Sequence, residues 1–293
     1  MKIAILLRRH PPSRKSPIMP EVIRLLTEWG ARVATIYPEE EGGHLTAASV
    51  EHDLYVLKSG SDRALSLAGA LHALGAKVLN PFPASAILRD RISVAHVLEA
   101  AGISTPATYV TGDPSDLAAL LAEGPLLIKP HRGSHDQAAG QDRGSQGQGV
   151  FLVRDTDDLN RRVTRPGLIF AQRWLPHEGE DHKIYCINDQ VFGVRRGWPV
   201  ETYEQKLGEP LTITVELRDI ARNCGRVFGV ELFGVDIIFS GGRPYVVDVN
   251  SFPGFKGVPD AALRLADQIY AAAREAAERL SRRGPDRWQQ EAV

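Results

Sequence analysis

Two carboxylates in the last quarter of the sequence are spaced for metal chemistry. GVDIIF and VVDVN carry Asp236 and Asp248 on two apolar segments that SGGR joins by a tight turn. Asn250 shares a strand face with Asp248, because residues two apart point the same way. Hard oxygen ligands of this kind suit Mg2+, which keeps some waters and bridges phosphate oxygens. We expect these three residues to hold Mg2+, with Mn2+ as an alternative ion. In the competing interpretation, Asp236 caps a turn or pairs with an arginine.

A glycine-rich segment is a candidate for phosphate binding. GSQGQG, residues 144–149, leads directly into the apolar VFLV. Glycine permits close approach, so its backbone amides can lie over a triphosphate. The segment lacks a GK[ST] ending and no helix follows it, which excludes a P-loop and a dinucleotide fingerprint. Lys129 ends the preceding strand, PLLIKP, and is placed to meet the same phosphates. The alternative interpretation is an ordinary surface loop.

Basic side chains gather where the predicted strands end. They follow the first strand, the third strand and Lys129, and others lie in a predicted hairpin: Arg8, Arg9, His10, Arg14, Lys15, Lys58, His131, Arg132, His135, His182, Lys183, Arg195 and Arg196. Loops at the carboxyl ends of strands form the binding crevice of an open α/β sheet. The chain is neutral overall, with 35 Lys and Arg against 36 Asp and Glu, so this clustering indicates an anionic substrate. For any single residue, a solvated surface charge is the alternative.

The composition excludes several classes of protein. Balanced charge gives no reason to expect a nucleic-acid or membrane partner. Cys186 and Cys224 form no CxxC pair, which argues against a disulfide framework or a structural zinc site. The sequence has no GxSxG or HExxH motif. The first apolar run is too short for a signal peptide, and no stretch reaches membrane-spanning length. We expect a soluble, cytoplasmic protein.

The elements that position these residues form an α/β part followed by an α+β part. The first third alternates IAILL, RVATIY and DLYVLK with helical patterns, one of them over 65–74, and predicts a small parallel sheet. A turn is expected at Asn80 and the prolines that follow it. A second unit begins near residue 88 with a helix over RISVAHVLEA, and Asp113-Pro114 caps another helix.

The last two thirds predict antiparallel strands. PLLIKP and VFLVR form a strand, loop and strand around the glycine-rich segment. HKIYCI-ND-QVFGVR and LFGVDIIF-SGGR-PYVVDVN predict two hairpins. Helices are expected over 214–228 and 260–280.

Taken in order, these motifs resemble the ATP-grasp superfamily. The similarity rests on LLIKP, the glycine segment, QRWL as a hinge, HKIY, and above all FGVDIIF and VVDVNSFPGF, and it covers nearly the whole chain. It implies an N-terminal βαβ domain and two α+β lobes that sandwich ATP. The implied units are a substrate-side domain over 1–87, a central lobe with a glycine-rich lid over 88–172, a C-terminal lobe with the metal site over 173–283, and a flexible tail over 284–293.

The resemblance also implies roles for individual residues. Asp236, Asp248 and Asn250 would hold the metal, and Lys183 and Arg196 would offset charge on the transferred phosphoryl group as catalytic residues. The nucleotide-binding residues would be Lys129, Gly144, Ser145, Gly147, Gly149, Gln172, Arg173, Trp174, Leu175 and Asp181. The acidic substrate would meet Arg8, Arg9, Lys58 and His131. Two positions depart from the family pattern: Arg91, where a nucleotide-contacting lysine is frequent, and Arg173, where an acidic residue is common.

Two branches of the superfamily compete. RDRISVAHVLEAAGISTP is similar to the ribosomal-protein glutamate ligases, which activate a carboxylate as an acyl phosphate for attack by an amine. LNPFPASAILRDR, HKIY and DVNSFPGFKGVP are similar to inositol polyphosphate kinases, which phosphorylate an alcohol of a small polyanion. We favour an ADP-forming ligase that uses a small acidic substrate and an amine, because most ATP-grasp enzymes are ligases. A nucleotide-binding module without catalysis is disfavoured because the metal triad is complete. The oligomeric state stays open.

Overall fold

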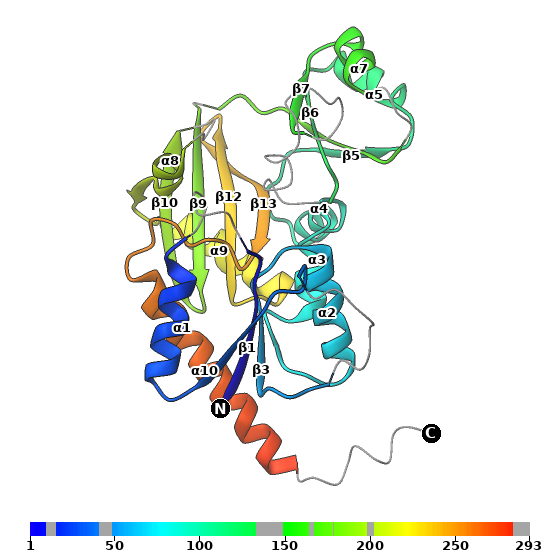
Figure 1. Cartoon of the computed structure of the whole chain (residues 1–293). Helices are drawn as coiled ribbons and strands as arrows, with labels where there is room; N and C mark the ends of the chain where they lie inside the picture. Colours follow the sequence, from blue (N-terminus) through cyan, green and yellow to red (C-terminus); the bar gives the residue numbers. More distant parts are fainter. Residues whose placement is uncertain are drawn as a thin grey trace.

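In the computed structural model, the residues that the structure describes form three sheets with their helices (Figure 1). The structure describes residues 1–9, 16–40, 49–132, 149–163, 167–177, 179–197 and 202–283. No helix within these ranges combines the length and apolar character needed to cross a membrane.

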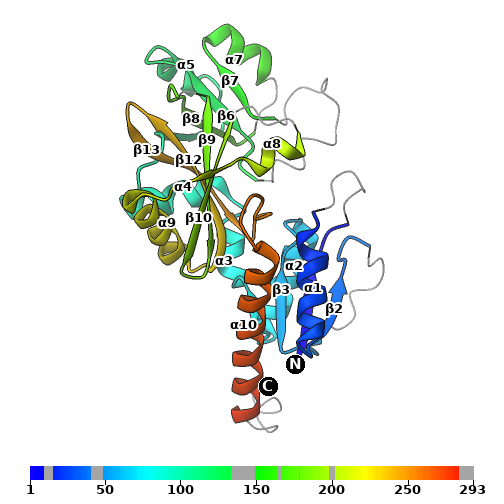
Figure 2. The same ribbon diagram turned by 90° about the vertical axis from the view of Figure 1, so that its left-hand side faces the viewer.

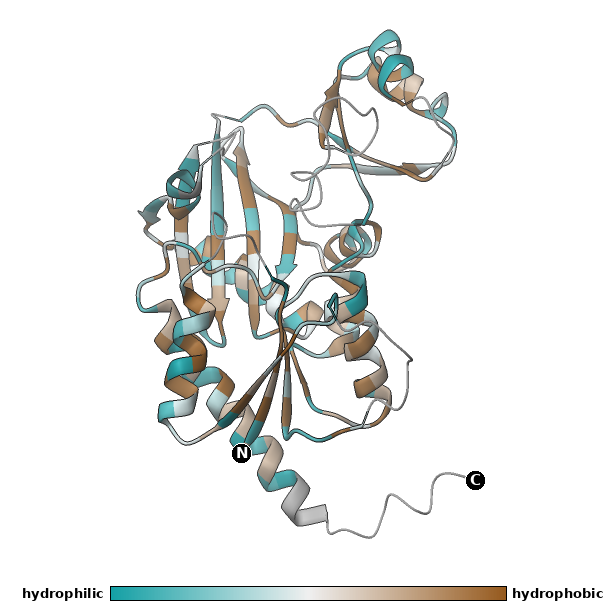
Figure 3. Cartoon of the chain, viewed as in Figure 1, coloured by the Kyte–Doolittle hydropathy of each residue, from teal (hydrophilic) through white to brown (hydrophobic). Residues whose placement is uncertain are grey.

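The N-terminal sheet is parallel, as predicted. Its strands are β1 (Lys2–Leu6), β2 (Arg32–Ile36), β3 (Leu54–Leu57) and β4 (Val78–Leu79), in the order β2-β1-β3-β4. Helices α1 (Ile18–Glu28) and α10 (Ala261–Arg283) pack on one face of this sheet, and α2 (Asp62–Ala73) packs on the other. The strands β1 and β3 are coloured mainly as hydrophobic in Figure 3, as expected for parallel strands that are covered on both faces. This strand order places a topological switch point beside the carboxyl ends of β1 and β3.

Local capping explains two differences from the predicted helices. Helix α2 begins at Asp62 instead of residue 65, because the Ser61 hydroxyl accepts a hydrogen bond from the Ala64 N–H. The turn predicted at Asn80 leads directly into a helix that the sequence patterns missed, α3 (Phe82–Ile87). Its first turn contains a proline, which is tolerated there because the N–H of that position has no partner within the helix.

The second sheet is small and antiparallel. It consists of β5 (Thr108–Thr111), β6 (Leu126–Lys129), β7 (Phe151–Val153) and β8 (Ile169–Arg173), in the order β5-β8-β6-β7. The predicted pairing of the two strands around the glycine-rich segment, β6 and β7, is confirmed. Helices α4 (Arg91–Ala100), α5 (Asp116–Leu121) and α7 (Thr156–Arg162) accompany this part of the chain. Asp113 was expected to cap a helix. Its carboxylate accepts a hydrogen bond from the N–H of Ser115, the residue just before α5.

The third sheet contains both predicted hairpins. Its strands are β9 (Glu180–Ile187), β10 (Gln190–Gly197), β11 (Glu209–Leu211), β12 (Leu232–Ser240) and β13 (Arg243–Ser251), in the order β11-β10-β9-β12-β13. A short helix, α8 (Tyr203–Leu207), follows β10, and α9 (Val215–Phe228) precedes β12. The two faces of this sheet differ. Ile184, Val235 and their neighbours pack against α9, whereas the opposite face carries charged residues at one end and apolar residues at the other.

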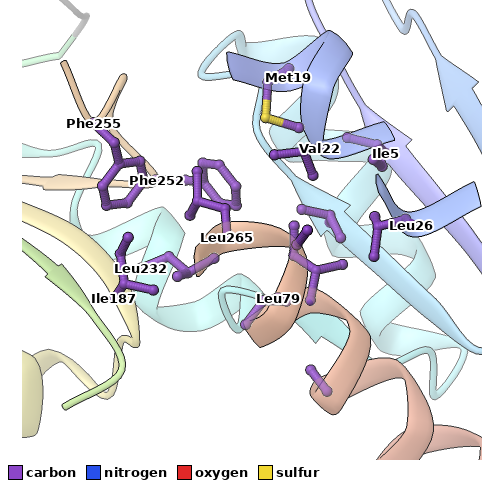
Figure 4. Close-up of a cluster of buried hydrophobic side chains, with 14 of the residues drawn as sticks. Ile5, Met19, Val22, Leu26, Leu79, Ile187, Leu232, Phe252, Phe255 and Leu265 are labelled. Carbon is purple, nitrogen blue, oxygen red and sulfur yellow. The ribbon is translucent and has the colours of Figure 1, made fainter. Parts of the chain in front are cut away.

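The apolar end of that face joins the third sheet to the N-terminal sheet. Ile187, Leu232, Phe252 and Phe255 form one buried cluster with residues of α1, α10 and the N-terminal strands (Figure 4). Helix α10 lies beside α1 and continues beyond the sheets (Figure 2). The large shared cluster fixes the N-terminal sheet against the third sheet, because buried apolar surface is the main source of such docking energy.

A buried polar side chain strengthens this junction. Asn80 is fully buried, and its Nδ2 donates to the Leu232 carbonyl at 2.7 Å and to the Ser251 hydroxyl at 3.0 Å. Its Oδ1 accepts from the N–H groups of Glu231 and Leu232. One amide therefore ties the end of β4 to the start of β12 and the end of β13.

Candidate active site

The three predicted metal ligands lie together on β12 and β13. Asp236 and Asp248 are direct partners in the strand register, which confirms that the two carboxylates are neighbours. The Asn250 amide donates to Asp236 Oδ2 at 2.9 Å. Within the described ranges, no group of three or more His, Cys, Asp or Glu is placed to hold a metal ion. An ion at this position would therefore use the two carboxylates together with the amide oxygen of Asn250.

Two cations from β9 and β10 complete the polar end of the sheet. Lys183 faces Asp236 across the β9–β12 pair, with Nζ 2.6 Å from Asp236 Oδ2. Arg196 faces Asp181 across the β9–β10 pair, forms an ion pair with it, and lies 3.5 Å from Asp236 Oδ1. The expected proximity of Lys183, Arg196 and the carboxylates is present. The alternative interpretation that Asp236 pairs with an arginine also describes a real contact.

Burial and neighbouring charges shift the pKa values of this cluster. The pKa of Asp181 rises to about 6, first because the carboxyl group is desolvated and second because the charge of Asp236 is close. Arg196 and Lys183 oppose this rise. The pKa of Arg196 is raised by Asp181 and Asp236 against the effect of burial. Its Nε is buried without a hydrogen-bond partner in the structure, so one donor of the cluster is available to an anion.

The second sheet presents Lys129 toward the same carboxylates. Lys129 Nζ donates to Gln172 Oε1 at 2.6 Å, and Gln172 Nε2 donates to the Thr108 hydroxyl at 3.1 Å. Gln172, assigned from the resemblance to the adenine site, thus uses its buried side chain to position Lys129. Desolvation lowers the pKa of Lys129 to about 8, and Asp248 and Asp236 partly counteract it. A desolvated ammonium group at the end of β6 is suited to bind phosphate.

Arg91 connects the second sheet to Asp248, a contact that the sequence patterns did not reveal. It is the first residue of α4, whose N-cap Asp90 accepts from the N–H groups of Ile92 and Ser93. The Arg91 guanidinium donates to the Pro130 carbonyl at 2.5 Å and lies 3.7 Å from Asp248 Oδ2. Its backbone N–H donates to the carbonyl of His131. The resemblance gave Arg91 as a departure from a frequent lysine at this helix start, and in the structure its guanidinium group faces Asp248.

The predicted hinge residues leave β8 toward β9. The Arg173 side chain turns away from the carboxylates and donates to the carbonyls of Leu120 and Gly124 at 3.0 and 2.6 Å, at the end of α5. It also pairs with Glu123. This contact explains a basic side chain where an acidic one is common. Trp174 donates its backbone N–H to Pro125, and its ring lies 5.0 Å from the His177 ring. Contact of this segment, including Leu175, with adenine stays a prediction.

The predicted substrate-binding cations have different surroundings. Arg8 and Arg9 are exposed, and Arg9 pairs with Glu40 and stacks 4.2 Å from the Tyr37 ring. Lys58 Nζ donates to the Phe252 carbonyl at 3.0 Å. Gly149 lies two residues before β7, and a Cβ added there would meet no atom within 4 Å. Gly144, Ser145 and Gly147, and the proposed lid over most of 131–149, lie outside the described residues.

Two cavities border the charged cluster. The larger, of about 540 Å3, lies beside β10 and contains Arg196 in its wall, together with Gly179, Glu180, Arg195, Gly197, Glu204, Gln205, Gly208 and Glu209. The smaller, of about 100 Å3, lies at the end of β3, with Asp248 and Asn250 in its wall. Both cavities thus have residues of the charged cluster in their walls.

The RimK-like ATP-grasp domain family matches residues 88–272, which is more than half of the chain. The chain belongs to the RimK-like ATP-grasp family. A probable alpha-L-glutamate ligase 2 of Shewanella amazonensis is 28% identical over 197 residues, which span 62% of this chain and 62% of that relative. The chain therefore covers less than two thirds of that relative's own length.

Solved structures agree with the ATP-grasp fold. A RimK domain protein of Sphaerobacter thermophilus superimposes with a TM-score of 0.70 at 20% identity, over 92% of this chain and 99% of the other. The ATP-grasp ligase PsnB, in a complex with minimal precursor, Mg and ADP, superimposes with a TM-score of 0.66 at 18% identity, over 93% and 97% of the two chains. These likenesses confirm the fold that the sequence motifs predicted.

The chemistry of the cluster fits ATP and Mg2+. The carboxylates Asp181, Asp236 and Asp248 face one more cation than they can neutralise: Lys129, Lys183, Arg91 and Arg196. The buried Arg196 Nε has no partner, and Lys129 is desolvated. A bound polyanion would accept from the Arg196 Nε and would offset the charge of the desolvated Lys129. The carboxylate and amide oxygens on β12 and β13 are of the type that Mg2+ requires.

Proposed function

We propose that this chain is an ADP-forming carboxylate–amine ligase that uses ATP and Mg2+. The observation that carries the proposal is the single sheet face on which Lys183 and Arg196 lie against Asp236, itself paired with Asp248. Membership of the RimK-like ATP-grasp family and the ligase name of a relative favour this reaction over phosphorylation of an alcohol. The inositol polyphosphate kinase alternative is therefore not favoured.

In the proposed reaction, a carboxylate oxygen of the acid attacks the γ-phosphorus of ATP. The bond from that phosphorus to the bridging oxygen breaks, and ADP leaves. The nitrogen of the amine then attacks the acyl carbon, inorganic phosphate leaves with the former carboxylate oxygen, and the nitrogen releases a proton to solvent. The net products are an amide, ADP and phosphate.

Each residue of the charged cluster has a role in this proposal. Asp236, Asp248 and Asn250 hold Mg2+, which offsets charge on the phosphate oxygens. Lys129, positioned by Gln172, binds phosphate oxygens of the nucleotide. Lys183 and the free Nε donor of Arg196 stabilise negative charge as the phosphoryl group moves. Lys183 and Gln172 are buried, and hydrogen bonds hold Lys183 to Asp236, Asn250 to Asp236 and Lys129 to Gln172, so these side chains need little reorganisation during the reaction.

The proposal also assigns a role to each unit of the chain. Residues 1–87 form the substrate-side domain, 88–172 the lobe with the lid, 173–283 the lobe with the metal site, and 284–293 the tail. The acidic substrate enters at the carboxyl ends of β1 and β3, and Lys58 borders its path. Arg8, Arg9 and His131 contribute positive charge around the entrance. The segment from Gln172 to Leu175 holds adenine.

Phosphorus NMR tests the reaction class directly. The purified protein is incubated with ATP, Mg2+ and pooled acids, with and without pooled amines and hydroxylamine. A ligase gives ADP and inorganic phosphate in equal amounts, and hydroxylamine captures the activated acid as a hydroxamate. A stable phosphate ester formed with ADP from an added alcohol would instead establish a kinase and contradict the proposal.

A further inference from the structure

The smaller cavity lies at the topological switch point of the N-terminal sheet. Leu57 to Gly60, at the end of β3 and just beyond it, form one wall, and Leu88, Arg89 and Arg91, at the junction of α3 and α4, contribute another. Asp248 and Asn250 form the third. Crevices at the carboxyl ends of parallel strands, where the strand order reverses, are the usual ligand sites of open α/β sheets. The cavity therefore joins a favourable ligand position to the metal ligands.

Arg89, which borders this cavity, has an unsatisfied donor. Its side chain is 17% exposed, and its Nε is buried without a hydrogen-bond partner in the structure. Its only carboxylate partner among the described residues is Asp62, at 3.3 Å, whose side chain is 87% exposed. A pair with so exposed a carboxylate is weak, and leaving a buried guanidinium donor unpaired is unfavourable. Arg89 therefore has a free N–H donor that an anion in the cavity can accept from.

The remaining polar groups of the cavity also favour an anion. Lys58 and Arg91 add two cations to its wall, against one carboxylate, Asp248. The hydroxyl oxygens of Ser85 and Ser251 lie 3.1 Å apart, and Asn80 already donates to the Ser251 hydroxyl. The two hydroxyls use one proton in their mutual hydrogen bond, so one of them can donate its proton into the cavity.

We propose that Arg89 binds a second carboxylate of the acidic substrate, one that does not react, in this cavity. The inference rests on the ligase function proposed above and narrows its acid to a small dicarboxylic acid or amino dicarboxylic acid. The volume of about 100 Å3 accommodates a carboxylate and a short carbon chain, and it is too small for a nucleotide or a polyphosphate. The reacting carboxylate then extends past Asp248 and Asn250 toward Lys183 and Arg196.

Arg89 is in this account a specificity residue that touches the substrate without touching the reacting atoms. Its planar guanidinium group matches a carboxylate better than an ammonium group does, because it presents parallel N–H donors. Loss of a hydrogen-bonded charge pair of this kind weakens binding by about tenfold or more. The loss should fall on the acid and leave ATP binding unchanged, since Arg89 does not border Lys129 or the hinge.

The test compares each dicarboxylic acid with the monocarboxylic acid that lacks one of its two carboxylates. ADP release is measured with glutarate, L-glutamate, 4-aminobutyrate and butyrate, each with hydroxylamine as the amine. We expect the wild-type protein to use the dicarboxylates at least about tenfold better in kcat/KM. Arg89→Met should raise KM for the dicarboxylates about tenfold or more and leave the monocarboxylates and the KM for ATP unchanged. Arg89→Lys should recover part of the loss. Arg63→Met, a charge removal on α2 outside the cavity, is the matched control.

A binding measurement separates this inference from the ligase proposal. Glutarate binding to the full-length protein is followed by calorimetry without ATP, for the wild type, Arg89→Met and Ser85→Ala. Binding that Arg89→Met abolishes supports the subsite even if no ligase product forms. If turnover depends on the acid and Arg89→Met leaves the KM for the dicarboxylates unchanged, the subsite is overturned and the ligase proposal stays intact. Absence of dicarboxylate binding to the wild type, or an equal loss of ATP binding in Arg89→Met, would also overturn it.

Discussion

Lys183 Nζ lies 2.6 Å from Asp236 Oδ2 across the β9–β12 pair, and both side chains are largely removed from solvent. The pair lies at the polar end of a sheet face whose other end is the apolar core shared with the N-terminal sheet. The pair therefore contributes both to the stability of the fold and to the charged cluster. Mutations can separate its effect on the free energy of unfolding from its effect on turnover.

Replacing Lys183 with methionine should destabilise the protein by about 3 kcal/mol or more, because it leaves the Asp236 carboxylate buried with fewer counter-charges. The double variant Lys183→Met with Asp236→Asn should be more stable than the sum of the single variants implies. Urea unfolding of the four proteins gives the coupling energy. Strictly additive effects would show that the pair contributes nothing to stability.

Asp248→Asn should reduce turnover by about 100-fold or more while leaving the melting temperature near that of the wild type. The substitution keeps the shape of the side chain and removes the charge that faces Asp236 and Mg2+. Its one described ion-pair partner, Arg91, lies at a long 3.7 Å, so little stability is lost. Turnover is measured as ADP release at saturating ATP and Mg2+. Near-normal turnover would remove Asp248 from the metal site.

A side chain at Gly234 is expected to displace the end of the Lys183 side chain. A Cβ there would lie 2.9 Å from Lys183 Cε and 3.2 Å from Pro253 Cγ. Gly234→Ala should therefore displace the Lys183 ammonium group from Asp236 and lower kcat more than it raises the KM for ATP. Gly112→Ala, where a Cβ meets no atom within 4 Å, is the matched control. Equal kinetics of the two variants would show that the position of Lys183 is unimportant.

ATP affinity should fall as the pH rises through about 8. Desolvation lowers the pKa of Lys129 from 10.5 to about 8, and only the protonated ammonium group attracts phosphate. Because the unfolded chain holds this proton up to pH 10.5, the stability of the nucleotide-free protein should rise between pH 8 and 10.5 at this group. Calorimetric titration with ATP from pH 6.5 to 9.5 measures the first effect. Lys129→Arg should flatten the profile, and an unchanged slope would assign the titration to another group.

Asn80→Ala should lower the free energy of unfolding by about 2 kcal/mol or more, because it leaves the N–H groups of Glu231 and Leu232 without the acceptor that the Asn80 side chain provides. Asn223→Ala, an exposed position on α9, is the control. A loss no greater than that of the control would mean that the junction between the two sheets depends on the apolar cluster alone.

Much of the candidate site could be predicted because it is encoded by short, regular patterns. Strand alternation and the tight turn between β12 and β13 were sufficient to place Asp236 beside Asp248. The polar loop between two apolar runs was sufficient to pair β6 with β7. These features depend on residues close in sequence, and the strand period of two fixes which side chains share a face.

The remaining features depend on contacts between distant segments. The unsatisfied donor of Arg89 becomes visible only when the loop after β3, the α3–α4 junction and the end of β13 are brought together. The same is true of Gln172, whose side chain positions Lys129 from a neighbouring strand. The contacts of the Arg173 side chain with the end of α5 were not predicted either, because the orientation of a side chain at a strand end is set by the tertiary surroundings.

Transfer of labelled oxygen tests the central claim most directly. An acid carrying 18O in its carboxylates is incubated with the protein, ATP, Mg2+ and an amine, and the inorganic phosphate is analysed by mass spectrometry. A ligase that proceeds through an acyl phosphate places one 18O atom in each phosphate formed. Unlabelled phosphate formed in step with amide, or ADP formed without any dependence on the acid, would contradict the account.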